Sequence, residues 1–216
     1  MNDMLVAAGI DSQLEVATDN NCIDRFVKQH NPTHVIIEAL WVVPTKFDIL
    51  TKLHPHVKWI IRLHSEMPFI ASEGIAMDWI ADYVSFPQIS IGVNAPRMLR
   101  EVRAYLRVKQ GWDKTTTNKR VFYQPNYYPT NFKRKKFKNV PGYIDISCFG
   151  AVRPLKNHLI QAFAAIDFAN QLDKKLRFHV NAGRIEMQGG PVINNLKHLF
   201  AQLYKSGHEM INHGWR

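Results

Sequence analysis

Apolar runs of strand length alternate with longer amphipathic runs along this chain. HVIIEA and KWIIRL are almost continuously apolar, which is typical of strands buried on both faces. Longer stretches such as PRMLREVRAYLRVKQG repeat apolar residues every three or four positions, as helices do. The alternation predicts an α/β protein with parallel sheets covered by helices. We expect strands at residues 14–18, 34–38, 58–64, 83–86, 90–94, 121–124, 144–149, 176–181 and 209–212.

Residues 125–142 interrupt this rhythm with three prolines and a run of cations. Such a segment is typical of a linker. It divides the chain into a Rossmann-like unit, residues 1–124, and a second parallel-sheet unit, residues 143–216. The sequence starts in a predicted helix at 3–8 and stops just after a predicted strand. We therefore expect a first strand to be missing and the second unit to be incomplete.

The positive charge is concentrated in one window. Thirteen of the 28 lysines and arginines, but two of the 18 acidic residues, lie between Arg97 and Lys138. An anionic partner is one interpretation: nucleic acid bound without chemistry, or an anionic acceptor such as DNA or a charged glycan. A solvated linker is the other, and all three stay open. The candidate polyanion-binding residues are Arg100, Arg103, Arg107, Lys133, Arg134, Lys135 and Lys136.

Cysteine and histidine usage limits the chemistry. Cys22 and Cys148 lie in apolar surroundings far apart, which indicates buried thiols. With no signal peptide and no apolar run long enough to span a bilayer, we expect a reducing compartment, the cytoplasm. The ten histidines, including His54 and His56, lack the spacing of a metal-ligand set, so no metal is expected.

The stretch FGAVRPLKNH, residues 149–158, joins a predicted strand to a predicted helix. In a parallel sheet, ligands bind where strands end and helices begin. Arg153 and Lys156, beside the free N–H groups of a helix start, form a candidate site for phosphate or diphosphate. Asn157 is expected to cap the helix. Solvated surface charge is the competing interpretation for both cations.

The segment GAVRPLKNHLIQAFAAI resembles the loop and helix that open the nucleotide-sugar domain of retaining GT-B glycosyltransferases, including glycosyltransferase-like proteins of tailed phages and their environmental relatives. The resemblance implies two Rossmann-like units and a nucleotide-sugar donor. It also implies that Gly150 makes the turn and that Arg153 and Lys156, with Asn157, hold the donor diphosphate without a metal. The glycine-rich loop and the acidic motif of that family have no counterpart here, which puts activity of this polypeptide in doubt.

Polar residues also follow two strands of the first unit. In RLHSEMPF, His64, Ser65 and Glu66 emerge together at the end of a strand. The resemblance implies that His64 faces a sugar, so His64 and Glu66 are the candidate catalytic residues and Ser65 a candidate contact. Glu38 closes HVIIEA and Trp41 follows, a carboxylate and an indole that suit a sugar ring. A capped loop and a structural tryptophan remain the alternatives.

Overall fold

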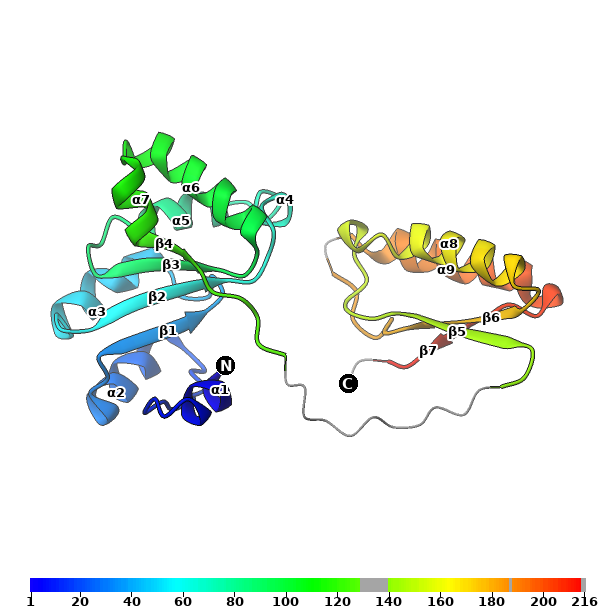
Figure 1. Ribbon diagram of the computed structural model, residues 1–216, viewed down its shortest axis with the longest axis horizontal. Helices are drawn as coiled ribbons and strands as arrows, with labels where there is room; N and C mark the ends of the chain where they lie inside the picture. The colour runs from blue at the N-terminus through cyan, green and yellow to red at the C-terminus, as the bar shows by residue number, and fades with distance from the viewer. Residues whose placement is uncertain (129–139, 187, 215–216) are drawn as a thin grey trace. The chain divides into compact units, whose positions relative to one another are not determined.

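The computed structural model describes residues 1–128, 140–186 and 188–214. The chain forms two units, Met1–Asn131 and Phe132–Arg216, each built on its own parallel sheet (Figure 1). The predicted α/β class with two parallel-sheet units is therefore confirmed. None of the helices in the described residues is long and apolar enough to cross a membrane.

The first sheet has four parallel strands in the order β1-β2-β3-β4. Its core comes from alternate positions of the central strands, where Trp59, Ile61 and Leu63 of β2 are fully buried. The register places Ile61 beside Ile91. The strands are β1 His34–Glu38, β2 Lys58–Leu63, β3 Ile89–Val93 and β4 Val121–Tyr123.

The helices of the first unit begin and end at recognisable signals. Asp19 caps α2 by accepting from the backbone N–H groups of Asn21 and Cys22. Pro96 opens α6, and Gly111 ends it in the left-handed conformation. The elements are α1 Asn2–Ala7, α2 Asn20–His30, the 3₁₀ turn η1 Pro44–Lys46, α3 Phe47–Leu53, α4 Met67–Ile70, α5 Ala76–Tyr83, α6 Pro96–Gln110 and α7 Lys114–Arg120.

Several sequence predictions for the first unit were wrong. Residues 14–18 form no strand and leave Leu14 and Val16 exposed, although Glu15 contacts His30 of α2. Residues 83–86 complete α5 and its turn, because the apolar face of that helix extends to Tyr83. Residues 71–75, which include Gly74 with a φ of +62°, form turns, and α5 starts only at Ala76. Cys22 is only half-buried; Cys148 is buried, and both thiols are free.

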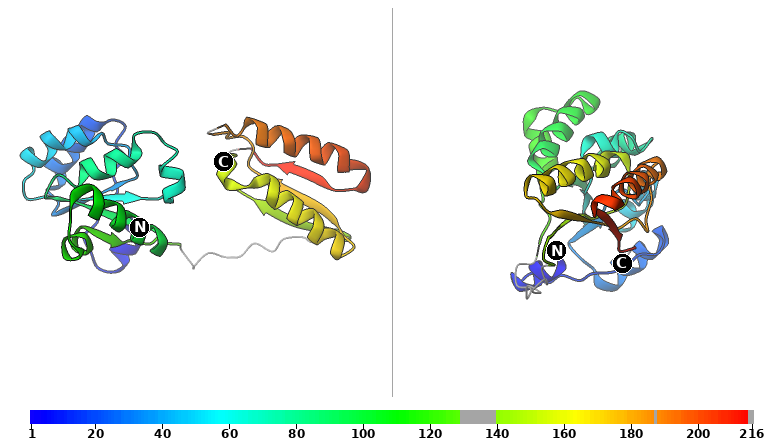
Figure 2. Two further views of the ribbon diagram at one scale, coloured as in Figure 1. Left: turned by 90° about the horizontal axis from the view of Figure 1, so that it is seen from above. Right: turned by 90° about the vertical axis from the view of Figure 1, so that its right-hand side faces the viewer.

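The second sheet has three parallel strands in the order β5-β6-β7. Both long helices, α8 and α9, lie side by side on one face of this sheet (Figures 1 and 2). Leu176, Phe178 and Val180 of β6 fill the space beneath them and are fully buried. The elements are β5 Tyr143–Cys148, the 3₁₀ turn η2 Pro154–Lys156, α8 His158–Gln171, β6 Lys175–Val180, α9 Gly190–Leu203, the 3₁₀ turn η3 Tyr204–Ser206 and β7 Glu209–Asn212.

Candidate functional site

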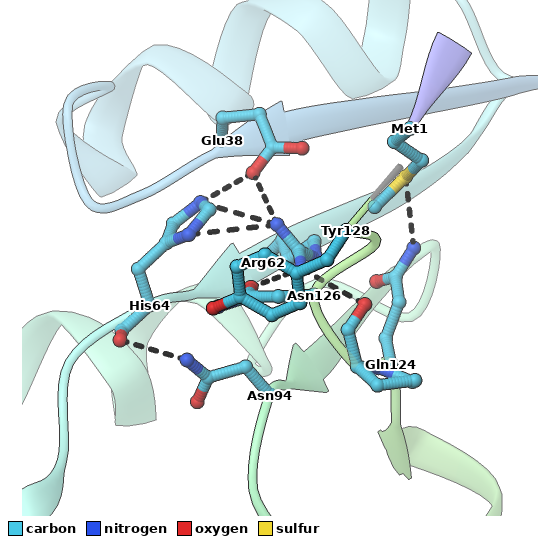
Figure 3. A network of polar contacts seen from close by, with 9 residues as sticks. Met1, Glu38, Arg62, His64, Asn94, Gln124, Asn126 and Tyr128 are labelled. Atoms are coloured by element: carbon cyan, nitrogen blue, oxygen red, sulfur yellow. Dashed lines mark hydrogen bonds and ion pairs between the residues drawn. The ribbon is translucent and has the colours of Figure 1, made fainter. Parts of the chain in front are cut away.

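A polar cluster occupies the carboxyl edge of the first sheet (Figure 3). Glu38 is the last residue of β1, Arg62 lies near the end of β2, and His64 follows that strand. Because the strands are parallel, their carboxyl ends meet at this edge, and the register pairs Glu38 with Arg62. Two candidates chosen from separate sequence segments, Glu38 and His64, therefore lie in one site.

Arg62 organises the cluster from below the surface. Its side chain is 5% exposed, and its Nη1 donates to Glu38 Oε2 at 2.9 Å. Its Nη2 donates to Asn126 Oδ1 at 2.6 Å and to the Pro125 carbonyl oxygen at 3.1 Å. Arg62 thus links the end of β1 to Pro125 and Asn126, which follow β4. A buried cation of this kind requires its counter-charge.

His64 is held on both its side chain and its backbone. Its Nε2 hydrogen-bonds to Glu38 Oε2, the same oxygen that Arg62 contacts. Asn94 Nδ2, from the end of β3, donates to the His64 carbonyl oxygen at 2.9 Å. The carboxylate fixes the orientation of the imidazole, which stays accessible. An oriented imidazole beside a carboxylate can bind hydroxyl groups or move a proton.

Among the other predicted residues of this edge, Glu66 has an ion-pair partner of its own. Glu66 Oε2 pairs with Arg97 Nη2 at 3.0 Å, and Arg97 Nε lies 3.4 Å from Glu101. Ser65, which lies between His64 and Glu66 in the sequence, is half-buried, and Trp41 is exposed. The structure brings Glu38 and His64 into contact and places Glu66 in an ion pair with Arg97 of α6.

The loop after β5 carries the two predicted cations of the second unit. Gly150 makes the turn with a φ of +114°, a conformation that favours glycine. A Cβ at this position would lie 2.9 Å from Lys156 Nζ, so the lysine amino group packs over the glycine. Arg153 Nη1 lies 3.4 Å from Glu186 Oε2. Asn157 is the N-cap residue of α8, as predicted, but it is left-handed, with φ of 54°, and its side chain makes no capping bond to the described residues.

His158, the first residue of α8, is fully buried beneath this loop. Burial lowers the pKa of His158, and the positive charge of Lys156 lowers it further. Burial also raises the pKa of the neighbouring Cys148 thiol. These two groups are therefore uncharged at neutral pH, and the net positive charge of the loop comes from Arg153 and Lys156.

A second polar network lies on the sheet face away from α8 and α9. Asp145 of β5 receives two hydrogen bonds from Arg177, at 2.7 and 2.6 Å, and one from His179 at 2.8 Å. His179 Nδ1 lies 2.8 Å from His213 Nε2. The hydrogen bond from Arg177, and then that from His179, lower the pKa of Asp145. Within this network, the negative charge of Asp145 is paired with the positive charge of Arg177.

The basic window is used partly for folding. Arg103 donates to the Val121 carbonyl oxygen through Nε at 3.1 Å and Nη2 at 2.8 Å. Arg120 donates to the carbonyls of Val84, Phe86 and Ile89. Arg100 and Arg107 are exposed. The remaining candidates, Lys133, Arg134, Lys135 and Lys136, lie outside the described residues.

Sequence reasoning missed Arg62, Asn126 and the Asp145 network. An arginine inside the apolar run KWIIRL was the available signal for the first, since a buried cation needs a partner. For the network, the signal was the polar residue at every second position of IDIS and LRFHV. Among the described residues, no group of three or more His, Cys, Asp or Glu side chains could hold a metal ion.

Comparisons with known proteins find distant similarity among solved structures. No protein-family profile and no curated protein matches the chain. Among solved structures, a glycosyltransferase from Rickettsia africae ESF-5 resembles it with a TM-score of 0.47 and 13% identity, over 99% of this chain and 57% of that chain. The chain thus spans just over half the length of that protein. This similarity is one of backbone structure and carries no conclusion about activity or ligand.

Proposed function

We propose that this chain is a glycosyltransferase, or part of one, that moves a sugar from a nucleotide diphosphate to a hydroxyl acceptor. The donor loop, Phe149–His158, carries the proposal. This loop joins the carboxyl end of β5 to the start of α8. In it, the amino group of Lys156 packs over Gly150, and Arg153 lies three residues before Lys156. Two cations beside a helix start can stabilise the charge of a departing diphosphate without a metal.

The carboxyl edge of the first sheet supplies the second half of the proposal. His64, oriented by Glu38, contacts the transferred sugar, and Glu66 is the second catalytic candidate. Glu38, Ser65 and Trp41 contact substrate hydroxyls or a ring face. The GT-B arrangement, the retained configuration and the nucleotide-sugar donor are the finer parts of this proposal, and they derive from the resemblance of the donor loop.

Thermal unfolding with nucleotides tests the proposal. We expect one of UDP, GDP or ADP, or a sugar conjugate of it, to raise Tm. Ligand at a hundredfold its Kd adds about 2.7 kcal/mol, and each kcal/mol shifts Tm by roughly 2–4 °C at this size. The double variant Arg153→Ala, Lys156→Ala should lose the shift. The matched control Lys197→Ala, Lys205→Ala removes two exposed lysines of the same unit and should keep it. A folded chain that responds to none of these nucleotides contradicts the proposal.

Polyanion binding without chemistry is a second candidate, favoured by the exposure of Arg100 and Arg107 on α6. It predicts DNA affinity that falls steeply with salt and does not change with nucleotide sugars. The variant Arg100→Ala, Arg107→Ala separates the two functions, since it should weaken DNA binding and leave the nucleotide response intact.

A further inference from the structure

The cations at the carboxyl edge of the first sheet are compensated. Arg62 is 5% exposed and bonded to Glu38, and Arg97 is paired with both Glu66 and Glu101. The carboxylates in these pairs outnumber the guanidinium groups. Although the whole chain has a net charge of +10, the described residues of this edge therefore offer no surplus positive charge to a phosphate backbone.

The second half of α6, which carries the exposed Arg107, extends away from that edge. The helix starts at Pro96, just after the carboxyl end of β3, and runs back toward the amino end of β4. Arg103 marks the direction, because it bonds the carbonyl of Val121, the first residue of β4. Arg107 lies one turn further along. A polyanion bound at Arg107 would lie away from Glu38 and His64.

Glu38 presents hydrogen-bond acceptor capacity at the carboxyl edge. The bonds from Arg62 and His64 both go to Oε2, and the side chain is 46% exposed. Within the described residues, Oε1 is left to accept from a ligand. A sugar hydroxyl donates a hydrogen bond to such an oxygen, whereas an ionised phosphodiester has no proton to donate and is repelled.

Tyr128 supplies an exposed aromatic surface in the same polar cluster. The residue is 74% exposed, and its hydroxyl accepts a hydrogen bond from Asn126 Nδ2 at 3.2 Å. Asn126 Oδ1 in turn accepts from Arg62 at 2.6 Å. Figure 3 shows Tyr128 in the same cluster as Arg62 and Glu38. An exposed ring suits the apolar face of a sugar.

We propose that the carboxyl edge of the first sheet binds an uncharged carbohydrate, with Glu38 accepting from its hydroxyls and Tyr128 covering its apolar face. The inference rests on the proposed function in naming this carbohydrate as the acceptor. The binding site itself requires only the acceptor-rich edge, the compensated charge of its described residues and the exposed ring of Tyr128.

The test is an NMR titration of the isotope-labelled full chain with maltose, cellobiose and N,N′-diacetylchitobiose. We expect one of them to shift signals of Glu38, His64 and Tyr128. Tyr128→Ala should weaken binding about tenfold, the factor that corresponds to roughly 1.4 kcal/mol of ring contact. Tyr204→Ala, which removes a tyrosine of 75% exposure from the second unit, should change nothing. Both rings are exposed, so neither variant is expected to unfold the chain.

Parallel titrations separate this inference from the proposed function. If the chain responds to a nucleotide and no disaccharide shifts the signals of this edge, the inference is overturned and the proposed function stands. Disaccharide shifts at this edge without any nucleotide response support the binding site and remove the transfer reaction. A short single-stranded DNA that shifts Glu38, His64 and Tyr128 when the sugars do not overturns the inference in favour of a polyanion.

Discussion

The amino group of Lys156 packs over Gly150, where a Cβ would lie 2.9 Å from Nζ. Gly150 also has a φ of +114°, so any side chain there is strained. We predict that Gly150→Val destabilises the chain by about 1–3 kcal/mol and abolishes the nucleotide-induced rise in Tm, as urea unfolding and thermal scans would measure. Gly190→Val is the matched control, because a Cβ there meets nothing within 4 Å. Equal effects of both variants would show that the turn at Gly150 has no special role.

Glu186 opposes the charge of Arg153. Its Oε2 lies 3.4 Å from Arg153 Nη1, and its Oε1 contacts Arg184. We predict that Glu186→Gln strengthens binding of a nucleoside diphosphate severalfold, since a competing carboxylate is removed from the loop while its shape is kept. Calorimetric titration would measure the change. Glu209→Gln, which lies on β7, serves as the control. Weaker binding in Glu186→Gln would mean that this carboxylate positions the arginine for the ligand.

Arg62 and Glu38 should show strong energetic coupling. Glu38→Gln leaves a buried guanidinium without its counter-charge and should cost about 1–3 kcal/mol of unfolding free energy, toward the lower end because Glu38 is half exposed. Arg62→Met in the same chain should recover part of that loss. Denaturant unfolding of the two single variants and the double variant completes the cycle, with Asp11→Asn as an exposed carboxylate control. Strict additivity would show that the pair contributes no coupling.

His158 should make the second unit sensitive to mild acid. Its folded pKa lies below the ordinary value of 6.5, because the charged form is buried beside Lys156. The unfolded chain therefore binds more protons, and stability falls as pH drops below about 6.5, by at most about 1.4 kcal/mol per pH unit. Thermal unfolding between neutral and mildly acid pH would measure the slope. His158→Leu should flatten it, whereas an unchanged slope in that variant would assign the sensitivity to another group.

The sequence predicted the strands better than it predicted the contacts between them. The run HVIIE is strand β1 because a continuous apolar segment of that length fits a buried parallel strand. Residues 14–18, LEVAT, also have apolar side chains yet pair with no strand, because an apolar pattern specifies a buried face and not a partner. Whether a segment with an apolar pattern becomes a strand depends on its tertiary contacts.

The site shows the same division. The position of Arg153 and Lys156 at a strand end followed from local chemistry, and so did the candidacy of Glu38, whereas the candidacy of His64 came from the resemblance to a family. The role of Arg62 did not, because its partner Asn126 is 64 residues away along the chain. Pairing over such separations leaves no trace in a single sequence, except the presence of a cation where an apolar residue is expected.

That long separation also sets when the site can form. Arg62 holds Glu38 on one side and Pro125 and Asn126 on the other, so its bonds are complete only after the fourth strand has joined the sheet. Contacts of high sequence separation form late, since the intervening chain must first be ordered. During synthesis, a ribosome-bound chain that has not yet extended past Asn126 would hold the imidazole and the carboxylate but lack the bonds that Arg62 makes beyond β4. The completed site is therefore a marker of a first unit that has finished folding.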